Sequence, residues 1–190
     1  MESTPKQQAR QTAAAMRHLV RRNEAAREDE SLTPLQWTAL QYFSMANSLS
    51  RTVSGFACYN ATSRGTASQV IKQLDSRGYV HRLRNPDDGR SADIRLTGAG
   101  EALLAGNSAA QLFEAIEELP DAGRQFLDRV VQRLIRSCRG SGDVVSVGTC
   151  RDCRCLQRLD GQLPYCRRAD RMLHDDDLDA LCIIHEPGNG

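Results

Sequence analysis

The chain has 190 residues, and its 25 Lys and Arg residues nearly balance its 24 Asp and Glu residues, so the formal net charge is only +1. A protein so close to neutrality does not bind nucleic acid through overall basic charge, so any such affinity must come from local placement of basic side chains. No apolar run is long enough to span a bilayer, and the N-terminus lacks the apolar stretch of a signal peptide, so we expect a cytoplasmic protein without a membrane partner.

The first predicted element is a helix over residues 6–30, a segment rich in Gln, Ala, Arg and Glu. Its apolar residues trace only a narrow stripe at helical spacing: Ala9, Ala13, Met16, Leu19 and Val20. A thin stripe on a long helix suits contact with a second chain, and a helix that merely covers its own domain is the alternative.

A second helix is predicted to begin at Thr33-Pro34, because Thr is a good N-cap and Pro is favoured at the first helical position. Trp37 follows at helical spacing with other apolar residues, so we expect the single Trp of the chain to face a core. Residues 52–59 predict a short third helix, in which we interpret Cys58 as a small buried hydrophobic residue.

A fourth helix is predicted from about Thr62, because apolar residues recur there at i, i+3, i+4 and i+7: Ala67, Val70, Ile71 and Leu74. The opposite face is polar and basic. With the helix before it, this segment forms a helix-turn-helix, whose second helix meets base edges mainly through its N-terminal residues. We therefore expect the following residues to contact DNA: Ser63, Arg64, Gly65, Thr66, Ser68, Gln69 and Lys72.

A small β hairpin, or wing, is predicted after this helix. Gly78 ends the helix, residues 79–84 alternate in polarity, residues 85–89 are dense in turn formers, and residues 94–96 return as a strand. Between residues 62 and 97 the sequence has seven basic residues against four acidic ones, so the local charge is positive although the chain is nearly neutral.

The sequence of this region resembles the MarR family of bacterial transcriptional regulators over residues 32–104. The resemblance lies in three motifs: Leu74-x-x-Arg77-Gly78-Tyr79-Val80-x-Arg82, Asp87-Asp88-Gly89-Arg90-Ser91 and Ile94-x-Leu96-Thr97-x-x-Gly100. It implies a regulator of transcription that binds double-stranded DNA, not an enzyme, with repression as the commoner mode and a small-molecule or redox effector. It also implies an ion pair between Asp88 and Arg90 that shapes the wing, and it implies that Arg90 reaches into the minor groove.

Two further helices are predicted, from Thr97 to Pro120 and from Asp121 to Cys138. The apolar face of the second is too wide for one neighbour. The resemblance implies that the first and last helices build a homodimer, which would bind a pseudo-palindromic operator. The expected fold is mainly α with a small β wing (α+β), divided into a dimerisation helix (1–30), a winged helix-turn-helix (31–104), dimerisation helices (105–139) and a linker with a cysteine-rich extension (140–190).

Five of the seven cysteines fall within the last part of the chain, after the linker. In a reducing compartment such thiols are more often free or metal-bound than paired in disulfides. The first choice of ligands for a structural Zn²⁺ site is Cys150, Cys153, Cys166 and Cys182, with Cys155 or His185 as the competing fourth ligand. The alternative is an iron-sulfur cluster that would make the protein a redox- or iron-sensing regulator.

The remaining charged groups of the extension receive no chemical role. Arg151, Arg154 and two later arginines could offset thiolate charge or form a solvated surface. Residues 175–177, three consecutive aspartates, are interpreted as a solvated acidic turn. Cys182 and His185 lack an orienting acid or an oxyanion feature, so we expect no catalytic residues.

Overall fold

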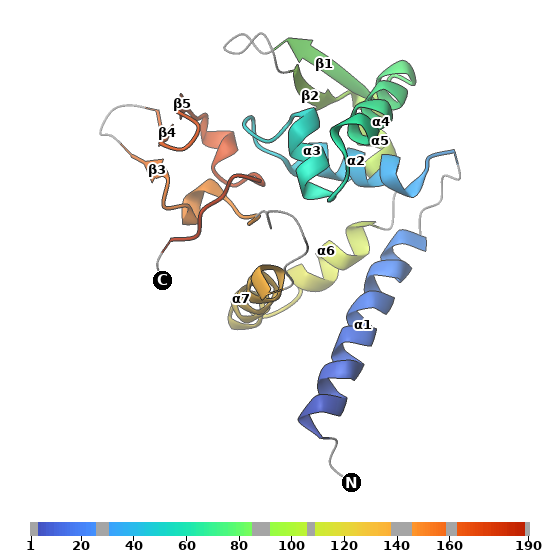
Figure 1. Cartoon of the computed structure of the whole chain (residues 1–190), viewed down its shortest axis with the longest axis vertical. Helices are drawn as coiled ribbons and strands as arrows, with labels where there is room; N and C mark the ends of the chain where they lie inside the picture. Colours follow the sequence, from blue (N-terminus) through green and yellow to red (C-terminus); the bar gives the residue numbers. More distant parts are fainter. Residues whose placement is uncertain are drawn as a thin grey trace.

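The structure is a computed structural model of the whole chain, and it describes residues 4–25, 31–84, 92–105, 109–137, 146–158 and 163–188. Figure 1 shows three parts: a compact winged-helix body, a set of helices below it from which α1 extends, and the cysteine-rich extension beside the body. The predicted fold class is confirmed, because the structure is mainly helical with a small antiparallel hairpin.

The winged-helix body contains four helices and the hairpin. These elements are α2 (Pro34–Met45), α3 (Val53–Tyr59), α4 (Arg64–Ser76), β1 (Val80–Arg84), β2 (Ala92–Leu96) and α5 (Gly98–Ala105). Their apolar faces meet in one core, in which Trp37 is 2% exposed and Phe56 and Ile71 are fully buried. The predicted core position of the single Trp is therefore confirmed.

The helices begin where polar caps satisfy their first backbone amides. Thr33 forms a capping box with Gln36, whose side chain accepts from the Thr33 amide at 2.8 Å. Ser63 caps α4 by accepting from the Thr66 amide at 3.1 Å, so this helix begins at Arg64 and not near Thr62 as predicted. Cys58 is exposed on α3, so the expectation of a buried thiol is wrong.

The turn between α2 and α3 is held inside the core. The Tyr42 hydroxyl donates to the Ser50 carbonyl at 2.6 Å, and burial raises the pKa of Tyr42, so the phenol stays a donor. Gly55 lies against the same carbonyl, and a Cβ there would be 2.2 Å from the Ser50 oxygen. Only glycine therefore fits at this position.

The hairpin confirms the two predicted strands of the wing. They pair antiparallel from Val80 opposite Leu96 to Arg84 opposite Ala92. The Ile94 amide also donates to the Arg51 carbonyl at 2.8 Å, which ties the hairpin to the α2–α3 turn. The tip of the wing, residues 85–91, lies outside the described residues, so the ion pair of Asp88 with Arg90 stays a prediction.

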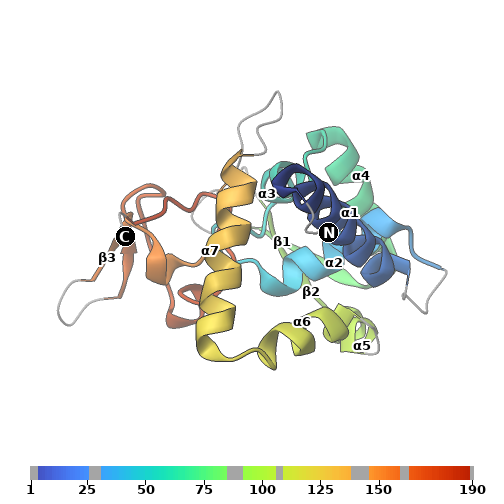
Figure 2. The ribbon, with the colours of Figure 1, turned by 90° about the horizontal axis from the view of Figure 1, so that it is seen from below.

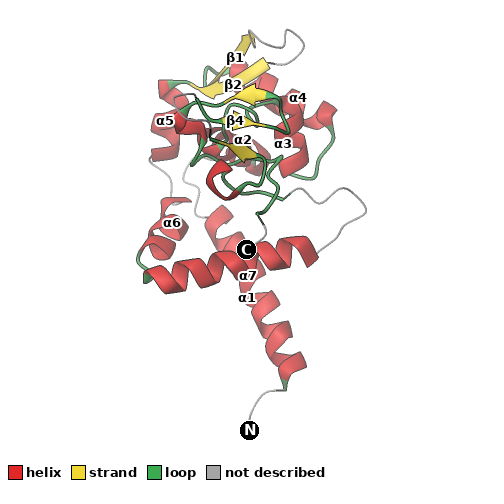
Figure 3. Cartoon of the chain, turned by 90° about the vertical axis from the view of Figure 1, so that its left-hand side faces the viewer, coloured by secondary structure: helices red, strands yellow, loops and turns green. Residues whose placement is uncertain are grey.

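Three helices lie outside the body: α1 (Pro5–Ala25), α6 (Ala109–Glu117) and α7 (Asp121–Ser137). The single helix predicted from Thr97 to Pro120 is described as α5 and α6, and residues 106–108 between them are not described. Figure 3 shows α1 at the end of the molecule opposite to the hairpin. No helix in the described ranges is long and apolar enough to cross a membrane.

The cysteine-rich extension forms a small sheet that the sequence does not predict. Its strands are β3 (Leu156–Gln157), β4 (Tyr165–Cys166) and β5 (Arg171–Met172), which pair antiparallel in the order β3-β4-β5. Two short 3-10 helices, Cys150–Asp152 and Asp175–Asp177, complete it. Leu173 and Leu178 form its core together with four of its cysteines.

Candidate nucleic-acid interface and cysteine cluster

Helix α4 presents its polar face to solvent because its apolar face is used by the core. Ala67, Ile71 and Leu74 are fully buried, and a hydrogen bond of 2.9 Å from Gln36 Nε2 to Gln73 Oε1 fixes α4 on α2. Six of the seven predicted DNA-contacting residues are exposed on or beside α4, and Ser68 is half-buried. The structure thus brings the predicted set together on one helix, with its charged and amide side chains free to reach outward.

The basic members of this face are available for contact. Arg64 and Lys72 have no ion-pair partner within the described parts of the chain. Ser63 and Thr66, by contrast, are already hydrogen-bonded to each other at the start of the helix, with their hydroxyl oxygens 2.9 Å apart. Arg64, Gln69 and Lys72 are therefore the side chains with most freedom to read a groove.

The cysteines of the extension gather in two places. The Cys150 thiol donates a hydrogen bond to Cys182, which lowers the pKa of Cys182, and that bond together with burial raises the pKa of Cys150. Cys166 is buried in the same cluster. Cys153 lies instead beside Cys155, where burial raises the pKa of Cys155 to about 11.

The predicted metal ligands are tested by this arrangement only in part. Buried thiols with nitrogen donors on sulfur suit a soft metal ion, and such donors are Asn47 Nδ2 to Cys150 at 3.5 Å and the Glu186 amide to Cys153 at 3.4 Å. Among the described residues, however, no group of three or more His, Cys, Asp or Glu side chains is arranged to hold an ion. The ligand set of Cys150, Cys153, Cys166 and Cys182 therefore stays a prediction, as do its alternates.

The arginines of the extension pair with carboxylates. Arg151 is bound to Asp179, and Arg154 and Arg168 both reach Glu186, at 2.5 and 2.6 Å. Arg167 donates to the Arg154 carbonyl at 2.6 Å. These contacts tie the segments of the extension together at its surface.

The extension is docked on the α2–α3 turn through backbone bonds. The Leu181 amide donates to the Met45 carbonyl at 2.8 Å, and the Asn47 amide donates to the Leu181 carbonyl at 2.9 Å. The Ile183 amide donates to Ser50 Oγ at 3.1 Å. Leu181 and Ile183 also pack against the winged-helix core, so the extension is part of the body.

Two polar side chains complete the docking, and sequence reasoning missed both. Asp177 accepts from the Ser48 amide at 2.7 Å and from the Ser48 hydroxyl at 2.9 Å, and it is only 4% exposed. The interpretation of residues 175–177 as a solvated acidic turn is therefore wrong for Asp177. Asn47 is fully buried between the turn and Cys150, and its Oδ1 has no hydrogen-bond partner in the described residues.

A helix-turn-helix whose second helix exposes a polar face, followed by a hairpin, defines a winged-helix DNA-binding unit. Residues 30–91 match the family model described as MarR family. This part of the chain belongs to the MarR family, whose members are DNA-binding transcriptional regulators and not enzymes. No curated protein matches the chain.

Solved structures agree with this fold. The MarR family transcriptional regulator from Streptomyces coelicolor, solved in complex with DNA, is 19% identical with a TM-score of 0.54, over 75% of this chain and 97% of that chain. A probable transcriptional regulator from Pseudomonas aeruginosa is 29% identical with a TM-score of 0.43, over 63% of this chain and 93% of that chain. Each alignment spans nearly all of the other protein and leaves a quarter or more of this chain without a counterpart.

We expect Asp177→Ala to loosen the extension from the body, because it leaves the Ser48 amide and hydroxyl without their acceptor and removes the bond to the His174 amide. The free energy of unfolding in urea should fall by about 2 kcal/mol, since hydrogen bonds to charged groups contribute more than neutral ones. Amide hydrogen exchange at Ser48 and Ile183 should also become faster.

The control is Asp176→Ala, an exposed residue of the same 3-10 helix, which should change stability by less than about 0.5 kcal/mol. Equal exchange rates in the two variants would contradict the docking role of Asp177.

Proposed function

We propose that this protein is a sequence-specific DNA-binding transcriptional regulator that acts as a homodimeric repressor on a pseudo-palindromic operator. The observation that carries the proposal is the exposed polar face of α4, which has the predicted residues Arg64, Gln69 and Lys72 on the outer side of a helix fixed by its buried face. Its membership of the MarR family supports the same activity. Repression is the direction that the family resemblance implies.

Docking in the major groove follows from the shape of this unit. A helix enters the groove with its N-terminal residues nearest the base edges, where Arg and Gln side chains form specific hydrogen bonds. Ser63 and Thr66 stand at this end and would accept or donate to the backbone or bases. Arg90, at the tip of the wing, would add a contact in the minor groove.

Two copies are needed because the basic excess of one copy is small. The helices outside the body expose large apolar side chains: Met16, Leu19, Val20, Phe113, Ile116, Phe126, Val130 and Leu134. Phe126 is 63% exposed and Phe113 is 65% exposed, which is costly in water unless another surface covers them. A second copy placed on α1, α6 and α7 would bury these side chains and would set the half-sites about one helical turn apart.

A metal ion in the extension is a second proposal, which the buried thiols support. Cys150, Cys153, Cys166 and Cys182 would hold Zn²⁺, with Cys155 or His185 as the alternate ligand. The described arrangement contains no group of three arranged around an ion, so binding requires these side chains to close onto the metal. Asn47 and the Glu186 amide already direct donors at two of the sulfurs, which stabilises thiolates.

The DNA-reading role predicts that Arg64→Ala and Lys72→Ala each weaken binding to a duplex selected from random sequences by the wild-type protein. A loss of about tenfold is expected for each contact, and removal of a phosphate contact should reduce the salt slope by about 1. Arg90→Ala should weaken binding similarly and leave the dimer intact. Arg17→Ala on α1 is the control, and gel-shift titrations in which all four variants bind alike would exclude this interface.

The dimer predicts that Phe126→Glu yields a monomer, because a charge in an apolar interface is costly to bury. Gln125→Glu adds the same charge at the neighbouring position, on a different face of α7, and should remain dimeric. Light scattering coupled to size exclusion separates the two masses. A dimer that persists in Phe126→Glu would place the interface elsewhere.

The metal proposal predicts about one Zn²⁺ per chain in protein purified anaerobically without chelators. Cys166→Ser and Cys182→Ser should lose the metal, whereas Cys58→Ser, which changes an exposed thiol on α3, should keep it. Elemental analysis measures zinc, and iron with visible absorption would identify a cluster instead. Wild-type protein that contains neither metal would overturn the proposal.

A further inference from the structure

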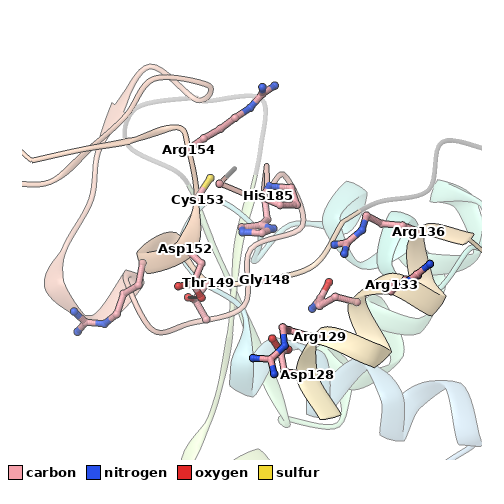
Figure 4. A pocket seen from close by; sticks show the side chains of 14 residues that line it. Asp128, Arg129, Arg133, Arg136, Gly148, Thr149, Asp152, Cys153, Arg154 and His185 are labelled. Carbon is pink, nitrogen blue, oxygen red and sulfur yellow. Dashed lines mark hydrogen bonds between the residues drawn. The ribbon is translucent and has the colours of Figure 1, made fainter. Parts of the chain in front are cut away.

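A cleft of about 850 Å³ lies between α7 and the cysteine-rich extension (Figure 4). One wall is formed by α7, and the other by residues 148–154 and 185–188. The Gln132 side chain donates to the Val147 carbonyl at 3.0 Å and joins the two walls at one point. The volume is within the range of small-molecule sites, roughly 300 to 1,000 Å³. Figure 2 shows α7 alongside the extension.

The lining of the cleft is strongly basic. Five arginines line it, namely Arg129, Arg133, Arg136, Arg151 and Arg154, against two aspartates, Asp128 and Asp152. Five positive and two negative side chains leave three net positive charges, in a protein whose total formal charge is +1. Positive charge is therefore concentrated here, away from the DNA-reading face.

The arginines on the two walls differ in their partners. Arg151 and Arg154 already form ion pairs with Asp179 and Glu186. The three arginines of α7 have no ion-pair partner within the described residues. They recur at i, i+4 and i+7, so they share one helix face, on which like charges repel. Figure 4 shows Arg129 and Arg136 extending from α7 toward the extension.

The opposite wall offers no carboxylate that neutralises these three charges fully. His185 is 8% exposed, burial lowers its pKa, and the charge of Arg136 acts in the same direction. Its Nδ1 lies 3.2 Å from Ser146 Oγ, and its Nε2 makes no hydrogen bond of good geometry to the described residues. A neutral, buried imidazole thus faces an excess of cationic groups.

We propose that this cleft binds a small polyanion, a molecule with at least two carboxylate or phosphate groups, through Arg129, Arg133 and Arg136. Guanidinium groups bind both oxyanions through paired, charge-assisted hydrogen bonds. From Arg129 to Arg136 the helix rises about 10 Å, at 1.5 Å per residue, so several anionic groups are needed to meet all three side chains. A bound polyanion relieves their mutual repulsion and bridges α7 to the extension.

The site remains open in the proposed dimer. The exposed apolar residues Phe126, Val130 and Leu134 occupy a different face of α7 from the arginines, because successive residues are rotated by about 100°. A second copy on the apolar face therefore leaves the arginine face toward the extension. The site does not depend on DNA, so its test is independent of the proposed function.

The test is isothermal titration calorimetry of the full chain with citrate and with tripolyphosphate, at fixed ionic strength and without DNA. Binding of at least one probe is expected, and Arg129→Gln/Arg136→Gln should weaken it by at least about tenfold, since two charge-assisted contacts are lost. Citrate binding alone assigns a carboxylate ligand, tripolyphosphate binding alone assigns a phosphate ligand, and binding of both supports the shared oxyanion chemistry.

The matched control is Arg17→Gln/Arg21→Gln, which removes two exposed arginines from α1 at helical spacing and should retain wild-type affinity. Thermal unfolding without ligand checks that both double variants are folded. The proposal is overturned if neither probe binds the wild-type protein, or if the two double variants lose affinity equally.

Discussion

The turn between α2 and α3 is the constraint on which the rest of this structure depends. On its inner side the Tyr42 hydroxyl holds the Ser50 carbonyl, and Gly55 leaves no space for another side chain. Its outer side receives the extension through Asn47 and Leu181, and the Arg51 carbonyl receives the hairpin through the Ile94 amide. Buried backbone groups need partners, so this one turn fixes the helix-turn-helix, the wing and the extension together.

The cysteine cluster is coupled to the DNA-binding body through this turn. Asn47 is fully buried and donates to Cys150, while Cys182 lies next to Leu181, whose backbone pairs with the turn. A change at these thiols alters groups that touch the segment leading into α3. The physical requirement for coupling, an element that two sites both contact, is met here without a long chain of intermediates.

The parts of the fold that depend on local chemistry could be predicted from the sequence. The cap at Thr33, the apolar stripe of α4 and the alternation in β1 each follow from residues within one or two turns of chain. The docking of Asp177 on Ser48 could not, because it joins residues 129 positions apart and a single polar side chain in a loop has no periodic signal. For the same reason, cysteine spacing identified candidate ligands but not that Cys150 meets Cys182 while Cys153 lies beside Cys155.

Helix α7 is linked to the DNA-reading unit by two routes. Along the chain it follows α5 and α6, and across space the extension joins it to α2, through Gln132 with Val147 at one end and Leu181 with Met45 at the other. A dimer built on α7 would hold two copies of α4 at a spacing that depends on both routes. Because one copy has only a modest basic excess, DNA affinity would be sensitive to that spacing. The extension is therefore placed where a change in its own packing alters the geometry that the operator requires.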